Sequence, residues 1–160
     1  MVLQVSMNSG DYTVYLDWSN YRIWNGLVRE FNIYRKLGAN PPVLLATWNV
    51  NSFNARIPRV EQWLAEVRPD VLCLQETKMS DEAFPADLFT AEGYEVAHHG
   101  QGQWNGVAIA SRVGLEDPIN GFADGIEADV DARLVSARCG GVRVHSVYVP
   151  NGREVDHDHY

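Results

Sequence analysis

The apolar residues between positions 43 and 111 fall into short continuous runs that polar segments separate. "VLLAT" (43–47), "VLCLQ" (71–75) and "VAIAS" (107–111) are each followed by polar or turn-forming residues. Continuous apolar runs of this length predict strands that are buried on both faces. Further strands are expected at "YEVA" (94–97), "RLVSARC" (133–139) and "VRVHSVYV" (142–149).

Two helices are predicted between these strands. After the first strand, apolar residues recur at helical spacing: Ile57, Val60, Leu64 and Val67. Asn54 is a possible cap for this helix, and Pro58 lies in its first turn. A shorter helix is expected to start at Ser80, which two acids follow, and to end at Gly93. These strand–helix–strand units, followed by a hairpin at Gly140 and Gly141, predict an α/β layered domain with a mixed sheet.

Residues 1–42 differ in character from the rest of the chain. "YTVYLDW" (12–18) alternates like a half-exposed strand. Residues 20–34 place Trp24, Leu27, Val28, Phe31 and Tyr34 at helical spacing. We therefore predict a helix there, capped by Asp17 or Ser19 and ended by Gly38. The segment is interpreted as an aromatic-rich extension of unknown role, joined at Pro41 to a domain of residues 43–160.

Composition fits one ordinary globular domain. The chain has 160 residues, of which 46% are hydrophobic and 21% charged. No apolar run approaches the roughly 20 residues that a membrane-spanning helix needs, so we expect no membrane association. The opening residues lack the pattern of a secretory signal, and Cys73 and Cys139 suit reduced, buried thiols, so a cytoplasmic location is predicted. The net charge of −8 argues against indiscriminate polyanion binding, although a divalent cation can bridge acids to a phosphate.

Polar side chains stand at the ends of two successive buried strands. Asn49 follows the first apolar run and Glu76 follows the second. Ligands of α/β sheets bind at the carboxyl ends of the strands, and oxygen ligands of this kind suit a hard ion such as Mg²⁺. On spacing alone, a structural cap or a salt bridge, for example between Glu76 and Lys78, is the favoured explanation of the same residues.

Five motifs occur in the order and approximate spacing of a known family: "LATWNVNS", "PDVLCLQETK", "NGVAIAS", "ARLVSA" and "VYVPNG". Over residues 43–160 the chain resembles the exodeoxyribonuclease III / class II apurinic-apyrimidinic endonuclease family of the endonuclease/exonuclease/phosphatase superfamily. The resemblance implies part of a four-layer α/β sandwich, a mixed sheet flanked by helices, truncated before its second half. It also implies hydrolysis of double-stranded DNA with Mg²⁺ or Mn²⁺, at abasic sites and 3′ ends, by a protein that is a monomer when full length.

The resemblance carries roles to particular residues. Glu76 corresponds to the catalytic metal ligand, Asn49 lies beside that metal and helps to hold the site, and the Tyr148 hydroxyl reaches the scissile phosphate. Asn151 is a weaker candidate for substrate binding. The family's later Gly-Asp-x-Asn and Ser-Asp-His motifs are not found, and the terminal histidines do not stand in for them. We therefore expect the 160-residue chain alone to bind metal weakly and to have little or no nuclease activity.

Other polar and aromatic residues have plainer interpretations beside functional ones. Trp104 either stacks near DNA or, more simply, folds over a hairpin. Arg133 pairs with Asp129 or Asp131, or contacts a phosphate. The adjacent histidines 98 and 99 are expected to diverge rather than share a metal, the acidic segment 114–133 is interpreted as a solvated loop, and His145 is expected to be packed between sheet and helix.

Two other functions stay open. One is a phosphatase or phosphodiesterase of the same superfamily that acts on lipids or small molecules. The other is a non-enzymatic truncated product, for example an interaction module built around the N-terminal extension. The lysine two residues after Glu76 in "PDVLCLQETK" favours the DNA-repair branch over the first alternative.

Overall fold

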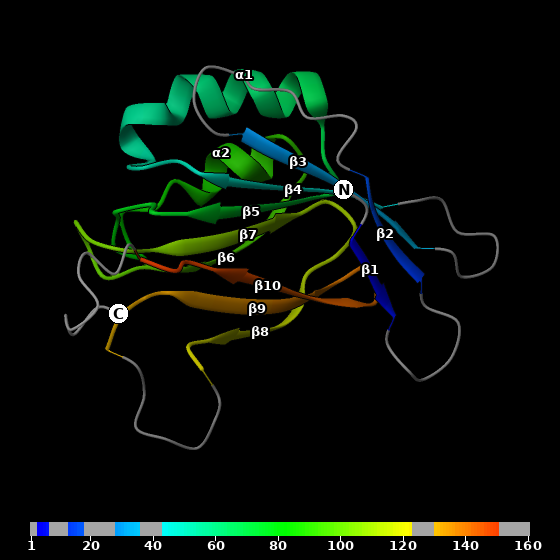
Figure 1. Ribbon diagram of the computed structural model, residues 1–160. Helices are drawn as coiled ribbons and strands as arrows, with labels where there is room; N and C mark the ends of the chain where they lie inside the picture. The colour runs from blue at the N-terminus through cyan, green and yellow to red at the C-terminus, as the bar shows by residue number, and fades with distance from the viewer. Residues whose placement is uncertain (1–2, 7–12, 18–27, 36–42, 123–129, 151–160) are drawn as a thin grey trace.

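A computed structural model describes residues 43–122 and 130–150 in full and residues 3–6, 13–17 and 28–35 as backbone strands. The described residues form two stacked β-sheets with helices over one outer face (Figure 1). The larger sheet has seven strands in the order β1-β2-β3-β4-β5-β7-β6, and the smaller has three in the order β10-β9-β8. This mixed α/β architecture confirms the fold class expected from the sequence.

The centre of the large sheet contains the strands that the apolar runs predict. β4 (Val43–Asn49) runs parallel to β5 (Val71–Gln75), which pairs antiparallel with β7 (Val107–Ser111). β6 (Glu95–His99) forms one edge of the sheet beside β7. Every residue of β5 and β7 is buried, because helices cover one face and the small sheet covers the other.

Two hydrophobic layers hold these elements together. One lies between the helices and the large sheet and includes Trp63 and Leu64 of α1 with Leu72 and Leu74 of β5. The other lies between the two sheets and includes Cys73, Ile109 and the inward residues of β9 and β10. Cys73 and Cys139 are both buried and free, as expected for reduced thiols.

The first helix is preceded by a short 3-10 turn, η1 (Asn54–Arg56), and α1 itself spans Ile57–Val67. Asn54 does not cap it, since it lies inside η1 and Arg56 occupies the cap position without a side-chain hydrogen bond. Pro58 lies in the first turn as predicted. The expected stripe faces the core: Val60 and Leu64 are buried, and Ile57 and Val67 are partly buried against the same cluster.

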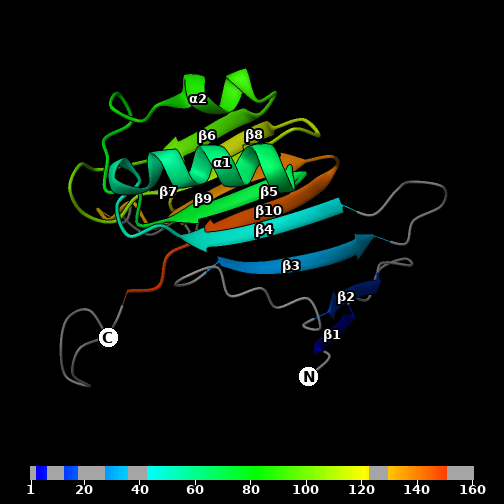
Figure 2. The ribbon, with the colours of Figure 1, turned by 90° about the horizontal axis from the view of Figure 1, so that it is seen from above.

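The second helix, α2 (Ala86–Ala91), starts later than predicted. Ser80 instead opens a turn in which its carbonyl accepts hydrogen bonds from the amides of Ala83 and Phe84. Pro85, which restricts the residue before it and lacks an amide proton, delays the helix to Ala86. Seen from above, α2 lies over the β6 side of the sheet (Figure 2).

The small sheet consists of β8 (Glu116–Asn120), β9 (Leu134–Cys139) and β10 (Val142–Val147). The hairpin between β9 and β10 is confirmed, with Gly140 and Gly141 both at positive φ. The interpretation of 114–133 as a solvated loop is wrong for β8, which pairs with β9 while all five of its residues stay exposed. Main-chain hydrogen bonds to an open edge need no apolar side chains, so the alternation pattern does not reveal such a strand. Residues 123–129 lie outside the described residues.

The N-terminal extension contributes β1 (Leu3–Ser6), β2 (Thr13–Asp17) and β3 (Val28–Arg35). The strand predicted at 12–18 is confirmed by β2. The helix predicted over 20–34 is wrong for the part that is described, because β3 pairs antiparallel with β4. The open edge of β4 offers backbone partners that helical spacing cannot reveal. The expected capping residue Asp17 ends β2, while the other expected helix boundaries lie outside the described residues. Among the described helices, none is long and apolar enough to cross a membrane.

Candidate active site at the carboxyl ends of β4 and β5

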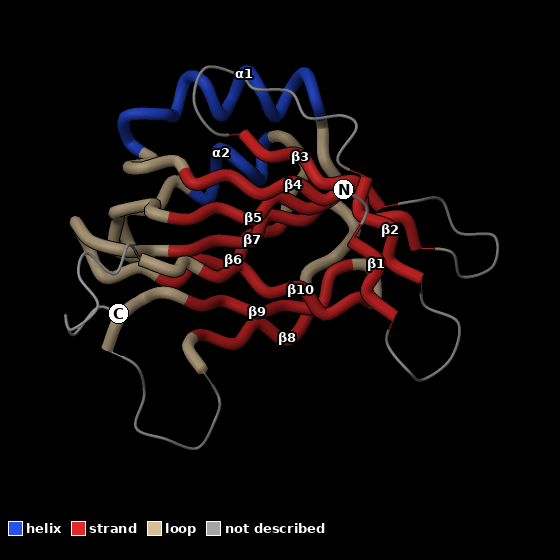
Figure 3. Tube along the Cα trace, viewed as in Figure 1, coloured by secondary structure: helices blue, strands red, loops and turns tan. Residues whose placement is uncertain are grey.

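The loops that follow β4 and β5 lie at the same end of the large sheet (Figure 3). Asn49 is the last residue of β4 and pairs with Gln75, the last residue of β5, so Glu76 stands beside Asn49 at this end. Parallel pairing therefore unites the two polar residues that the sequence places after successive strands. The structure confirms the expected proximity.

Three side chains donate hydrogen bonds to the Glu76 carboxylate. Asn49 Nδ2 lies 2.8 Å from Glu76 Oε1, and Lys78 Nζ lies 3.1 Å from Glu76 Oε2. The Tyr148 hydroxyl is the third donor. The salt bridge with Lys78, one of the two interpretations left open by the sequence, is thus present.

These contacts keep the carboxyl ionised. Burial is the largest single influence on Glu76 and raises its pKa. The three hydrogen bonds and the positive charge of Lys78 together outweigh burial, so the pKa of Glu76 lies below its ordinary value. For Tyr148, burial and the neighbouring Glu76 charge raise the pKa of the phenol, although Arg133 opposes this. At neutral pH the site therefore pairs a charged carboxylate with a protonated phenol.

Asn51 completes the network and was not among the residues expected from the sequence. Its Oδ1 accepts a hydrogen bond from Lys78 Nζ at 2.6 Å, and its backbone N–H donates to Asn49 Oδ1 at 3.0 Å. Asn51 lies two residues beyond Asn49 in "WNVNS", so its place in that motif was the available signal. Asn49 and Lys78 are therefore each held on two sides, which fixes them around Glu76.

The remaining candidates lie at varying distances from this centre. The amide of Tyr148 donates to the carbonyl of Arg133 at 2.8 Å, so Arg133 stands beside the tyrosine, and its side chain pairs with Asp131 as one interpretation predicted. Trp104 does not fold over the hairpin, because 65% of it is exposed. The backbone carbonyl of its neighbour Asn105 accepts a hydrogen bond from the amide of Lys78 at 2.9 Å, so the tryptophan stands on the rim of the site. Asn151 lies outside the described residues.

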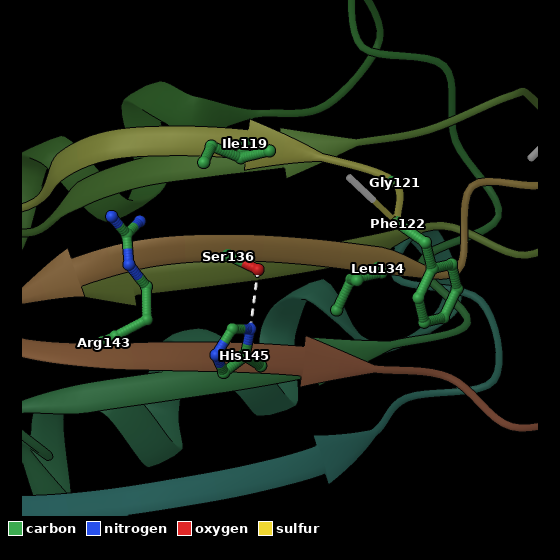
Figure 4. A pocket seen from close by; sticks show the side chains of 7 residues that line it. All are labelled: Ile119, Gly121, Phe122, Leu134, Ser136, Arg143 and His145. Carbon is green, nitrogen blue, oxygen red and sulfur yellow. Dashed lines mark hydrogen bonds between the residues drawn. The ribbon is translucent and has the colours of Figure 1, made fainter. Parts of the chain in front are cut away.

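A hollow of about 370 Å³ lies on the outer face of the small sheet, lined by residues of β8, β9 and β10 (Figure 4). His145 lies here, exposed and hydrogen-bonded through Nδ1 to Ser136 at 2.7 Å, so the prediction that it is packed between sheet and helix is wrong. The prediction assumed a helix over this outer face of the small sheet, where the described residues form none. His98 and His99 diverge as expected, since His98 contacts Asp81 and His99 contacts the carbonyl of Leu134.

The donor set at Glu76 is compatible with a hard divalent ion. Mg²⁺ is commonly bound by one or two carboxylates, with water and substrate phosphate supplying the other oxygens. Glu76 supplies an ionised, half-buried carboxylate, and Asn49 supplies an amide that orients it. Among the residues that the structure describes, no group of three His, Cys, Asp or Glu side chains surrounds a common point. The role of Asn49 as a direct metal ligand stays a prediction.

An ionised carboxylate, an amide and a phenol thus gather at the strand ends of a two-sheet α/β fold, which is where such sheets bind ligands. Residues 46–159 match the model of the Endonuclease/Exonuclease/phosphatase family, and the chain belongs to that family. It is 34% identical over 116 residues to the exodeoxyribonuclease III of Haemophilus influenzae, an alignment that covers 70% of this chain and 43% of that protein.

Solved structures show the same relationship. An AP endonuclease from Archaeoglobus fulgidus superposes with a TM-score of 0.67 at 40% identity, covering 72% of this chain and 44% of the other. The 3′ phosphatase NExo from Neisseria, solved bound to a product DNA hairpin, superposes with a TM-score of 0.68 at 40% identity over the same shares. The chain thus spans less than half the length of these relatives, and the resemblance seen in its motifs is confirmed.

Proposed function

We propose that this chain carries the metal-binding carboxylate of a DNA-repair nuclease of the exodeoxyribonuclease III type, which hydrolyses phosphodiester bonds at abasic sites and 3′ ends. The observation that supports it best is the ionised Glu76, fixed by three donors at the strand ends. The named relatives are an exodeoxyribonuclease III, an AP endonuclease and a 3′ phosphatase, and the phosphatase was solved with a product DNA hairpin. The substrate of this chain is inferred from them.

Each residue of the cluster has a role in this proposal. Glu76 would bind Mg²⁺ or Mn²⁺, and Asn49 would hold the carboxylate in place through its amide. The bound ion would neutralise charge that develops on the phosphate oxygens and on the departing oxygen. The raised pKa of Tyr148 keeps its hydroxyl protonated, so it can donate to a phosphate oxygen once Glu76 is bound to metal.

Net charge supports a metal-bridged complex rather than simple electrostatic binding. The chain carries −8 overall, so a DNA phosphate is not attracted to it by charge alone. An ion at Glu76, with Lys78 beside it and Arg133 near Tyr148, gives the site a local positive character. Trp104 on the rim offers an exposed ring on which a base can stack.

The chain by itself should bind metal weakly and turn over DNA slowly or not at all, because its described residues supply a single carboxylate at the site. Binding is therefore the informative assay. We expect Mg²⁺ to strengthen the binding of a fluorescent abasic-site duplex, measured by anisotropy. Glu76→Gln should abolish this metal dependence, whereas Glu82→Gln, an exposed glutamate outside the cluster, should retain it.

Cleavage assays separate this proposal from its alternatives. The same preparations are incubated with an abasic duplex, a duplex carrying a 3′ phosphate and a phosphoinositide. Any turnover should require metal and be confined to the DNA substrates. Preference for the phosphoinositide would favour a lipid phosphatase, and DNA binding that ignores both metal and Glu76 would refute the proposal. Robust Mg²⁺-dependent cleavage would show that the isolated chain is active, contrary to our expectation.

A further inference from the structure

Three side chains behind the site form a continuous hydrogen-bonded relay. Asp81 Oδ1 lies 2.8 Å from His98 Nδ1, and His98 Nε2 lies 2.9 Å from the hydroxyl of Thr77. Asp81 Oδ1 also accepts the amide of Gly100 at 2.8 Å, which fixes the carboxylate. The relay therefore ends on Thr77, the residue that directly follows Glu76 in the chain.

The carboxylate sets the direction of the hydrogen bonds when the His98 ring is neutral. A carboxylate can only accept, so the Nδ1 proton of His98 donates to Asp81, and Nε2 of the neutral ring then accepts the Thr77 proton. The imidazole stacks on Phe84 at 4.1 Å, and its side chain is only 6% exposed. Burial lowers the pKa of His98, although Asp81 opposes this, so the neutral ring that the relay needs is the favoured form.

Thr77 cannot act as a nucleophile, although a hydroxyl, an imidazole and a carboxylate stand in line. It is fully buried. A Cβ added at Gly106 would lie 2.1 Å from its hydroxyl oxygen, so the glycine encloses it closely. A substrate therefore cannot reach the Thr77 hydroxyl, and we interpret the relay as a structural device that holds residues in place.

What the relay positions is the backbone of the candidate active site. Glu76 and Lys78, on either side of Thr77, both have φ in the left-handed region, at 53° and 52°. This conformation is unfavourable for residues with a Cβ and persists only where the surroundings hold it. The Thr77 carbonyl accepts the amide of Phe53 at 2.9 Å and the Glu76 carbonyl accepts the amide of Ser52 at 2.8 Å, so the main chain is held on that side. On the other side, the amides of Thr77 and Lys78 donate to the carbonyls of Gly106 and Asn105 at 3.1 and 2.9 Å, and the Thr77 side chain adds a further anchor through His98.

We propose that His98 and Asp81 are positioning residues for Glu76, acting through the buried hydroxyl of Thr77. The inference rests on the proposed function, because it gives the relay the task of holding the metal-binding carboxylate. Loss of the hydrogen bond from Thr77 to His98 should let Glu76 relax from its left-handed conformation. Metal affinity should then fall even though no ligand has been removed.

The test uses the whole chain and Mn²⁺, with affinity measured by calorimetry. Thr77→Val removes the hydroxyl, and His98→Phe removes its acceptor while keeping an aromatic ring against Phe84. We expect each to weaken Mn²⁺ binding about fivefold, which is the scale of one lost hydrogen bond. Thr77→Ser, which keeps the hydroxyl, should retain the wild-type affinity. His99→Phe, which loses the contact of the neighbouring histidine with Leu134, is the matched control and should leave it unchanged.

A second readout does not depend on metal. Hydrogen exchange of the Ser52 and Phe53 amides reports whether the segment 76–77 stays docked. In Thr77→Val and His98→Phe, exchange at these amides should quicken about fivefold. Exchange at Leu72 and Ile109, which lie within the paired strands β5 and β7, should not. If His98→Phe does not fold, Thr77→Val still decides the question.

The outcomes separate the relay from the proposed function. If Glu76→Gln binds Mn²⁺ as tightly as the wild type, the proposed function fails, and the amide exchange alone decides whether the relay exists. If Glu76→Gln weakens binding but Thr77→Val and His98→Phe change neither affinity nor exchange, the relay is refuted. A double variant that is no weaker than either single variant supports a single shared hydrogen bond.

Discussion

Lys78 offers a sharp test of how Glu76 is used, because the lysine and a metal ion compete for the same carboxylate. Its Nζ lies 3.1 Å from Glu76 Oε2 and 2.6 Å from Asn51 Oδ1, and the two charged side chains are 26% and 20% exposed. Lys78→Met removes the charge and both contacts while keeping an unbranched side chain of similar length.

The magnitude follows from simple electrostatics. Two unit charges 4 Å apart interact by about 1 kcal/mol at the dielectric of water, and a divalent ion doubles this value. Removing the lysine should therefore tighten Mg²⁺ binding roughly thirtyfold, since about 2 kcal/mol corresponds to about one and a half decades in affinity. In the absence of metal, the pKa of Glu76 should rise, because the hydrogen bond and the positive charge of Lys78 that lower it have been lost.

Calorimetry measures the first effect, and a pH titration followed by carbon NMR of the Glu76 carboxyl measures the second. Arg68→Met is the matched control, since it removes a positive charge from the exposed pair with Glu92, 3.5 Å apart, and Arg68 precedes β5 whereas Glu76 follows the other end of that strand. If Mg²⁺ affinity falls in Lys78→Met, competition is the wrong description, and Lys78 must act mainly by holding Glu76 in place.

Three further predictions concern the fold and its ionisable groups. Glu76 has a depressed pKa, so its contribution to stability is complete above the ordinary value of 4.5 and is lost as pH falls through the lower pKa of the folded state. In urea unfolding, acidification should therefore cost the wild type more stability than it costs Glu76→Gln. Equal losses in the two proteins would contradict this. Burial, with a smaller contribution from Cys139, raises the pKa of Cys73 to about 12, so at pH 8 a thiol reagent should label it only in urea, and rapid labelling of the native chain would refute its burial. Leu64→Ala should lose about 2–5 kcal/mol in urea unfolding because Leu64 is fully buried between α1 and the sheet, whereas Glu61→Ala on the exposed face of α1 should change stability by less than about 0.5 kcal/mol.

The core strands and the site centre could be predicted because their signals are local. β5 and β7 are continuous apolar runs, and Glu76 follows one of them in a specific motif. Parallel pairing of β4 with β5 then brings Asn49 beside Glu76 with no further assumption.

The elements that escaped prediction depend on partners distant in sequence. β3 carries apolar residues that fit a helix as well as a strand, and only its pairing with β4 decides between them. β8 has five exposed residues, so no hydrophobic pattern marks it, and it forms on the edge of β9. The same holds in the site, where Asn51 joins the network through a lysine 27 positions away. These elements and contacts are determined by tertiary pairing, which neither local propensity nor residue spacing reveals.

Metal affinity of the intact chain tests the central claim most directly. Calorimetric titration with Mg²⁺ and with Mn²⁺ should show weak binding that Glu76→Gln lowers by at least about tenfold, since a charged ligand is lost. Glu82→Gln, the same change at an exposed glutamate six residues along the chain, should leave binding unaltered. Equal affinities for the wild type and Glu76→Gln would contradict the assignment of this carboxylate as the metal ligand.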